Sequence, residues 1–148
     1  MTEYGPEVRE FVQSAIDDHG FLSWLNASVD EFEPGHVVMS VPYDKKLVNS
    51  GPQVDGNVHG GVAATLIDTV GGTAVRSALD EPLTAGVATI DLNVSYLRPA
   101  ANGLVATGDV VRVGSTVGVA EVTVESTTPD GEQKEVAVGR GSYRIFQG

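Results

Sequence analysis

The chain contains no cysteine, which excludes disulfides, thiolate metal sites and a cysteine nucleophile. Its three histidines (His19, His36 and His59) lie far apart and form no pair at metal-ligand spacing, so we expect no metal. No apolar run approaches the ~20 residues that cross a bilayer, and residues 1–10 lack the basic start and apolar run of a signal peptide. We therefore expect a cytoplasmic protein that does not act at a membrane.

Basic residues are scarce, since 9 Lys and Arg face 20 Asp and Glu and give a formal net charge of −11. Such a field repels phosphate backbones and argues against general nucleic-acid binding. Only Lys45, Lys46 and Lys134 are lysines. An acid-rich, lysine-poor surface suits solubility in high salt, where screening lengths fall to a few ångströms. Composition favours a halophilic source and an ordinary acidic cytoplasmic protein about equally.

The 148 residues, 41% of them hydrophobic, show no linker-like break, so we expect one domain over 1–148. Apolar residues at helical spacing predict an amphipathic helix over Pro6 to Asp18, within an N-terminal segment that ends at Gly20. The next apolar cluster is expected to pack in the core; its members are Phe21, Leu22, Trp24 and Leu25.

Strand-like patterns fill most of the remaining chain. They cover residues 27–32, 36–41, 87–97, 104–113, 117–128 and 132–146, and a second helix is predicted over 58–79. Only Asp68 and Arg76 are charged in that helix, and a helix so apolar on all sides must be buried. The order α-β-β-α-β-β-β-β predicts an α+β fold, an antiparallel sheet wrapped around a central helix.

Asp68 is the anomaly of the second helix. A carboxylate among apolar residues costs several kcal/mol unless other groups satisfy it. One interpretation is structural, with Asp68 capping a neighbouring backbone or pairing with Arg76. The other is functional, because carboxylates in such surroundings gather at active sites. We favour the functional interpretation.

The segment His59-Gly60-Gly61 opens the same helix, and its glycines allow a ligand to approach the free N–H groups of the first turn. A helix N-terminus favours developing negative charge, so this turn is a candidate oxyanion hole. Taken alone, the motif is more typical of a simple turn before a helix than of an oxyanion hole. Gly60 and Asp68 are eight residues apart, about 12 Å along the axis. If they share a site, they come from two subunits of an oligomer.

The strand over 87–97 alternates apolar and polar residues, which predicts that Ala88, Ile90, Leu92, Val94 and Tyr96 share a buried face. Thr89 lies on the opposite face in this pattern and is a candidate for orienting a water. The polar residues Asp91, Asn93 and Ser95 are at least as well explained as solvent-facing.

Two motifs together resemble the PaaI-like acyl-CoA thioesterases of the hotdog superfamily, which include the human THEM type. One is the helix from His59-Gly60-Gly61 to Asp68, and the other is the strand from Thr89 to Ala100, with Tyr96-Leu97-Arg98-Pro99 near its end. The resemblance covers the chain from about Phe21 to Phe146. It implies a hotdog fold, hydrolysis of the thioester of a small aromatic or fatty acyl-CoA, and no cofactor beyond the CoA of the substrate.

The resemblance also implies roles for single residues. Asp68 would be the nucleophile or general base, the Gly60 amide would polarise the thioester carbonyl, and Thr89 would hold the position of a water-orienting hydroxyl. His59 and Gly61 would shape the thiol-side pocket. A family asparagine that often precedes the His-Gly-Gly motif falls on Gln53 here, so the contact to the leaving group is expected from Gln53.

Alternatives remain for that contact and for the phosphates. Asn49 or Asn57 replaces Gln53 if the loop differs from the family's. Arg98, Arg112 and Arg140 are the candidates for contacting the CoA phosphates, although each is individually more typical of ordinary surface charge. We expect a homodimer or a dimer of dimers with composite active sites. The competing function is a non-catalytic acyl-CoA or small-ligand binding protein, because a fold does not fix its function. A hotdog dehydratase uses a different arrangement of histidine and aspartate, which is absent from this sequence.

Overall fold

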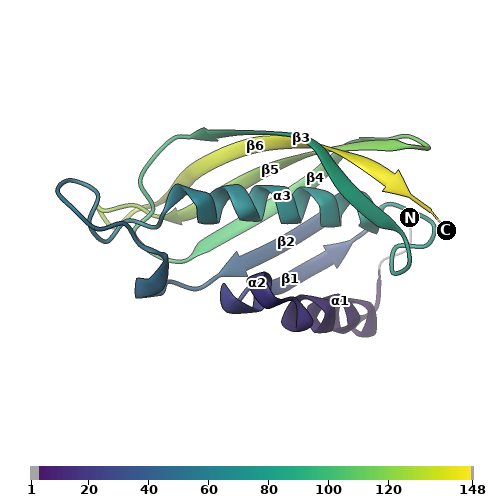
Figure 1. Ribbon diagram of the computed structural model, residues 1–148, viewed down its shortest axis with the longest axis horizontal. Helices are drawn as coiled ribbons and strands as arrows, with labels where there is room; N and C mark the ends of the chain where they lie inside the picture. The colour runs from purple at the N-terminus through teal and green to yellow at the C-terminus, as the bar shows by residue number, and fades with distance from the viewer. Residues whose placement is uncertain (1–3, 148) are drawn as a thin grey trace.

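One antiparallel sheet and one long helix dominate the computed structural model, which describes residues 4–147. The six strands lie in the order β1-β2-β4-β5-β6-β3, and α3 runs across one face of the sheet (Figure 1). The elements are α1 (Pro6–Asp18), α2 (Gly20–Trp24), β1 (Ser28–Glu33), β2 (His36–Val41), the 3-10 helix η1 (Lys45–Leu47), α3 (Gly60–Ser77), β3 (Gly86–Tyr96), β4 (Leu104–Val113), β5 (Val117–Thr127) and β6 (Gln133–Phe146).

The predicted strands and central helix are therefore present, each within about two residues of its expected bounds, and α2 and η1 are additions. Of the segment 1–20 expected to hold the N-terminal helix, residues 1–3 lie outside the described part.

The core lies between α3 and the concave face of the sheet. Val70 and Val75 of α3 are completely buried against β4 and β5. A Cβ at Gly108 would lie 2.7 Å from a Val70 methyl, and one at Gly118 would lie 2.5 Å from a Val75 methyl. Only glycine at these two strand positions lets the helix approach the sheet this closely. The close approach fixes the height of α3 above the sheet.

The segment after α1 differs from its prediction. Leu25 is buried, but Phe21 and Trp24 on α2 are each about half exposed, so the expectation that both pack in the core is wrong. The reason is that both rings lie on the short helix α2, none of whose residues is buried. Figure 1 shows α2 beside α1 below the strands. Val12 and Ile16 of α1 supply the burial instead.

The predicted alternation along β3 is correct from Asp91 onward, where Leu92 and Val94 are half-buried, but it is wrong for Ala88 and Ile90, because a β-bulge lies at Ile90. Thr89 pairs with Tyr143 of β6, whereas Asp91 pairs with Ser142, so the side-chain parity changes between them. Thr89 therefore shares the inner face with the buried Tyr143, and Ile90 is 57% exposed. Bulges re-aim side chains in this way next to functional sites.

The prediction that α3 is buried on all sides is only partly correct. Most of the helix is buried, but one stripe is not. Its members are Gly61, Ala64, Thr65, Asp68 and Thr69, at the three- and four-residue spacing of one helix face. Since β3 ends the sheet, the stripe and the free edge of β3 are both open in a single chain.

His36, at the start of β2, links three strands. Its Nδ1 lies 2.7 Å from Asp109 Oδ1 on β4, and its Nε2 lies 3.1 Å from Glu31 Oε2 on β1. The hydrogen bond to Asp109 raises the pKa of His36, Glu31 raises it further, and partial burial opposes both.

Replacing His36 with glutamine is therefore expected to lower the melting temperature more at about pH 6 than at about pH 8.5. Because the folded pKa lies above the ordinary value of 6.5, the stabilisation is complete below that value and is lost as the pH rises through the raised pKa. Thermal melts of both proteins in buffers of equal ionic strength measure the difference. A gap that widens with rising pH would contradict the expectation.

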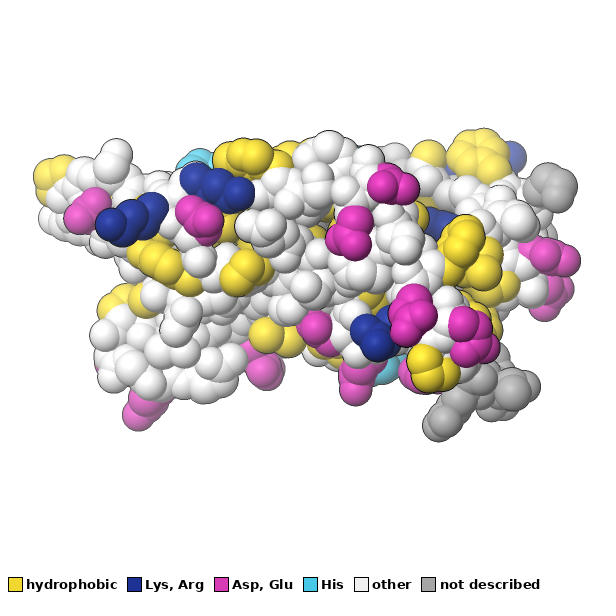
Figure 2. Space-filling view, turned by 90° about the horizontal axis from the view of Figure 1, so that it is seen from below, with side chains coloured by type: hydrophobic (Ala, Val, Ile, Leu, Met, Phe, Trp, Pro, Cys, Tyr) yellow, Lys and Arg dark blue, Asp and Glu magenta, His cyan; other side chains and the backbone are white. Residues whose placement is uncertain are grey.

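Among the described residues, no helix is both long and apolar enough to span a bilayer. Acidic side chains are spread along the whole length of the face seen from below (Figure 2), in keeping with the net charge of −11.

Candidate active site

The first turn of α3 leaves one amide unused. His59 is the N-cap, and its Nδ1 accepts a hydrogen bond of 2.8 Å from Gly61 N–H, while its carbonyl accepts from Val62 N–H. Within residues 4–147, Gly60 N–H donates to no other group. Of the two glycines expected to offer amides, only Gly60 thus keeps its N–H available, and it lies at the positive end of the helix dipole.

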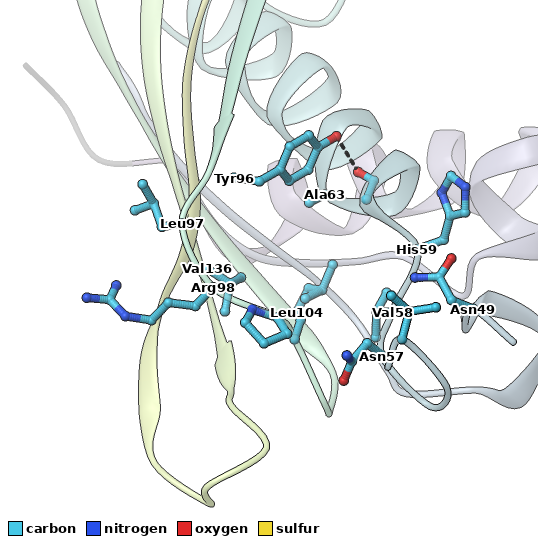
Figure 3. Close-up of a pocket in the computed structure, with 14 residues that line it drawn as sticks. Asn49, Asn57, Val58, His59, Ala63, Tyr96, Leu97, Arg98, Leu104 and Val136 are labelled. Carbon is cyan, nitrogen blue, oxygen red and sulfur yellow. Dashed lines mark hydrogen bonds between the residues drawn. The ribbon is translucent and has the colours of Figure 1, made fainter. Parts of the chain in front are cut away.

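Tyr96, at the end of β3, holds this turn from the sheet side. Its hydroxyl donates a 2.8 Å hydrogen bond to the Gly60 carbonyl, drawn as a dashed line in Figure 3. Its ring lies against Gly60 so closely that a Cβ there would be 3.0 Å from the ring. The sequence analysis gave Tyr96 no role in the site.

Replacing Tyr96 with phenylalanine is expected to lower kcat about 3-fold with little change in KM, because one exposed hydrogen bond is worth about 0.5–1 kcal/mol and the ring contact with Gly60 remains. Steady-state kinetics with a single thioester substrate measures kcat and KM separately. An unchanged kcat would mean that the hydroxyl does not help to position the turn.

A cavity of about 370 Å³, here called the Tyr96 cavity, opens beside Gly60. It lies between the start of α3, the end of β3 and the loop that precedes α3 (Figure 3). Most of its lining is apolar, and its polar side chains are those of Asn49, Asn57, His59, Tyr96 and Arg98. The lining residues are Asn49, Val54, Asn57, Val58, His59, Gly60, Ala63, Tyr96, Leu97, Arg98, Pro99, Ala100, Leu104 and Val136.

Gln53, expected at the leaving-group contact, does not line this cavity. It is exposed in the loop before α3 and has a positive φ of 74°. Asn49 and Asn57 line the cavity instead, and the Asn49 N–H donates to the Asn57 carbonyl at 2.8 Å. The conformation of the loop, which the sequence pattern did not predict, thus favours the two asparagines over Gln53 as the side-chain amides of the site.

Asp68 is hydrogen-bonded from β3. Thr89 Oγ1 donates to Asp68 Oδ1 at 2.6 Å, which the bulge at Ile90 makes possible by turning Thr89 inward. Arg76 lies elsewhere, with its guanidinium donating to the Pro82 carbonyl at 3.3 Å, and none of the ion pairs within residues 4–147 includes Asp68. The structural interpretation of Asp68 as a partner of Arg76 is therefore wrong.

Tyr143 of β6 supports the same turn of α3 from the sheet. Its hydroxyl donates a 2.9 Å hydrogen bond to the backbone carbonyl of Asp68, and burial, followed by the nearby Asp68 charge, raises the pKa of Tyr143. A Cβ at Gly71 or Gly141 would overlap its hydroxyl. Tyr143 was not predicted from the sequence, although the glycines at 139 and 141, two residues apart on its strand face, signal a close helix contact there.

A single chain does not bring Gly60 and Asp68 together. Gly60 has Tyr96 as its neighbour on β3, and Asp68 has Thr89, seven residues back along the same strand. The helix and the strand thus run side by side in opposite directions with one half of the predicted site at each end. The separation of about 12 Å expected from helical rise therefore holds in the folded chain.

The arginines proposed for phosphate binding differ in their positions. Arg98 lines the Tyr96 cavity, and its Nη1 donates to the Glu135 carbonyl at 2.8 Å. Arg140 instead pairs with Glu121 on the outer face of the sheet. Arg112 lies near the far end of β4. Only Arg98 is near Gly60, so it is the arginine that the structure favours.

The family model of the thioesterase superfamily matches residues 55–132. A protein of Halobacterium salinarum named "Putative esterase" is 60% identical over 138 residues, covering 92% of this chain and 91% of its own. Human acyl-coenzyme A thioesterase 13 is 27% identical over 148 residues, covering 98% and 99%. The crystal structure of a thioesterase family protein from Silicibacter pomeroyi superposes with a TM-score of 0.81 at 28% identity, covering 94% and 98%.

These matches confirm the predicted hotdog fold, in which a sheet wraps around a long helix. The chain belongs to the thioesterase superfamily and is a thioester hydrolase. The resemblance to acyl-CoA thioesterases on which the two motifs were interpreted is also confirmed.

Proposed function

We propose that this protein hydrolyses the thioester bond of an acyl-CoA with an apolar acyl group, and that Asp68 carries the chemistry. The observation that supports it most is the hydrogen bond from Thr89 to Asp68, which holds a partly buried carboxylate on the open stripe of α3. A carboxylate without a cationic partner, fixed by one donor, keeps its second oxygen for attack or proton transfer.

Two routes fit this carboxylate. In the first, Asp68 takes a proton from water, the water oxygen bonds to the thioester carbon, and the C–S bond breaks as the CoA sulfur receives that proton. In the second, Asp68 itself bonds to the carbon and expels CoA thiolate, and water then cleaves the resulting anhydride. In both, the oxyanion accepts a hydrogen bond from Gly60 N–H, which is free and lies at a helix N-terminus.

The site is complete only in a dimer, in which Gly60 of one protomer lies opposite Asp68 of its partner. The edge of the sheet supports this arrangement. β3 is 11 residues long, pairs only with β6 among the described strands and exposes Ile90, and Leu97 directly after it is exposed as well. Long free edges of this kind are normally covered in stable proteins. The open stripe of α3, with Asp68 in its middle, is another surface left uncovered in a single chain.

The Tyr96 cavity suits the CoA side of the substrate. Asn49 and Asn57 offer amide groups for the pantetheine arm, and Arg98 offers a positive charge to the phosphates in a protein whose net charge is −11. His59 shapes the wall of the cavity and caps α3 rather than acting as the base.

Thiol release from a panel of acyl-CoAs, from acetyl to long-chain and aromatic esters, tests the proposal. We expect release with at least one apolar ester at rates well above the uncatalysed reaction. Calorimetry on the same esters identifies the competing function, because tight binding of an acyl-CoA without any release would show a binding protein instead of an enzyme.

A further inference from the structure

A second cavity, of about 330 Å³, opens on the other side of His59 from the Tyr96 cavity. It lies between α2, η1 and the first turn of α3, and we call it the α2–η1 cavity. Its walls are Phe21 and Trp24 on one side and Leu47 and Val62 on the other. Nothing in the proposed chemistry so far uses it.

Two aromatic rings of α2 line this cavity and are half exposed to solvent. Phe21 is 51% exposed and Trp24 is 49% exposed, although each stands directly beside a hollow of apolar lining. Large apolar rings that flank a concave apolar surface typically mark a place where a ligand removes them from water. The α2–η1 cavity therefore has the composition of a site for an apolar group.

The single charged residue of this lining already has partners. The Lys46 ammonium lies 4.4 Å from the centroid of the Trp24 ring and donates a hydrogen bond to the Trp24 carbonyl. This arrangement holds the indole in place and leaves the lysine charge satisfied without a ligand. None of the lining residues within 4–147 is a carboxylate, so an uncharged group is not left beside an unpaired negative charge.

The position of the cavity connects it to the thioester. His59 lines both cavities, Gly60 lines the Tyr96 cavity, and Gly61 lines the α2–η1 cavity. A thioester carbonyl bound at Gly60 N–H carries its sulfur on one side and its acyl carbon on the other. Asn49, Asn57 and Arg98 line the Tyr96 cavity and fit the amides and phosphates of the CoA side. The α2–η1 cavity has no side-chain amide in its lining and is left for the acyl side.

We infer that the α2–η1 cavity holds the acyl group of the substrate and that Phe21 and Trp24 select its size and shape. The inference rests on the proposed acyl-CoA hydrolysis, since it assigns the two halves of that substrate to the two sides of His59. The substrate class is then an acyl-CoA whose acyl chain is uncharged and large enough to contact both rings.

A binding experiment tests this without turnover. Trp24 is the only tryptophan of the chain, so the intrinsic tryptophan fluorescence reports on this cavity alone. Titration with S-hexyl-CoA, a thioether that cannot be hydrolysed, is expected to shift the emission to the blue as the alkyl chain displaces water from the indole. Free CoA, which lacks the acyl side, is expected to leave the emission unchanged.

Calorimetry under the same conditions measures whether S-hexyl-CoA and free CoA bind at all. S-hexyl-CoA that binds without changing the Trp24 emission, an equal change with free CoA, or no binding of S-hexyl-CoA overturns the inference. Because the thioether is not a substrate, an enzyme that released no thiol from any ester would refute the proposed function and leave this titration to decide the cavity separately.

Kinetics of two variants supply the second test. Trp24→Ala and Phe21→Ala are each expected to lower kcat/KM for hexanoyl-CoA about 10-fold, the equivalent of one lost aromatic contact, and to change acetyl-CoA hydrolysis less than about 2-fold. Phe11→Ala is the matched control, since Phe11 is 54% exposed on α1 and does not line the cavity. Equal losses on both esters, or no loss on either, would contradict the inference, and Phe21→Ala decides it if Trp24→Ala does not fold.

Discussion

Replacing Asp68 with asparagine is expected to lower kcat for acyl-CoA hydrolysis about 100-fold to 10,000-fold while the fold and ligand binding persist. The amide keeps the shape of the side chain and still accepts the 2.6 Å hydrogen bond from Thr89, but it has no basic oxygen to attack the carbonyl or to take a proton from water. Thiol-release kinetics gives kcat, and thermal melts and S-hexyl-CoA calorimetry verify fold and binding.

Variants of Thr89 are expected to lose less activity than Asp68→Asn. Thr89→Val removes the hydroxyl that holds Asp68 and is expected to cost about 10-fold in kcat, because the carboxylate remains but is less well oriented. Thr89→Ser, the matched control, keeps the hydroxyl and is expected to stay within about 3-fold of wild type. A folded Asp68→Asn protein with near wild-type activity, or a Thr89→Val protein more damaged than it, would mean that the catalytic carboxylate lies elsewhere.

Mixing two inactive variants is expected to restore activity if each site takes Gly60 and Asp68 from different subunits. Gly60→Pro removes the free N–H, and proline is well accepted there because Gly60 is the first residue of α3 and His59 before it has the extended backbone that proline favours. Losing an oxyanion donor costs about 100-fold to 1,000-fold. The second variant is Asp68→Ala.

Equal amounts of the two variants, once exchanged, form heterodimers in which one of the two sites is intact. Half of the dimers are then mixed, so about a quarter of the wild-type activity returns. Gly60→Ala is the control for Gly60→Pro, since it places a similar Cβ 3.0 Å from the Tyr96 ring but retains the N–H. Proven subunit exchange without recovery would show that the two residues do not share a site across an interface.

Helical and strand periodicity was sufficient to predict most of the fold. β2 and β4 have the bounds expected from alternation alone, and α3 is the long apolar helix that the pattern indicated. These patterns are reliable because each reflects one burial direction that persists along a whole element. Periodicity failed to predict the burial of Phe21 and Trp24, because they lie on α2, a helix of only five residues that follows α1 directly.

Some residues of the candidate site were likewise predictable from the sequence, and others were not. The His59-Gly60-Gly61 turn and Asp68 could be found in the sequence, because a glycine pair before an apolar helix and a lone carboxylate within one are local anomalies. The loop that places Asn49 and Asn57, rather than Gln53, at the cavity depends on positive φ angles at Gly51, Gln53 and Gly56, which no periodic pattern encodes.

The sequence by itself determined the order of the elements, the family, the turn with Gly60 and the presence of a carboxylate in α3, since local propensity and burial periodicity specify these features. Only the tertiary structure decided which side chains meet. The bulge at Ile90 reverses the parity of β3 and turns Thr89 toward Asp68, and Tyr143 reaches the same turn of α3 from a strand 75 residues away in the chain. Such contacts depend on sheet register and helix height, which are set by packing between distant segments rather than by any segment alone.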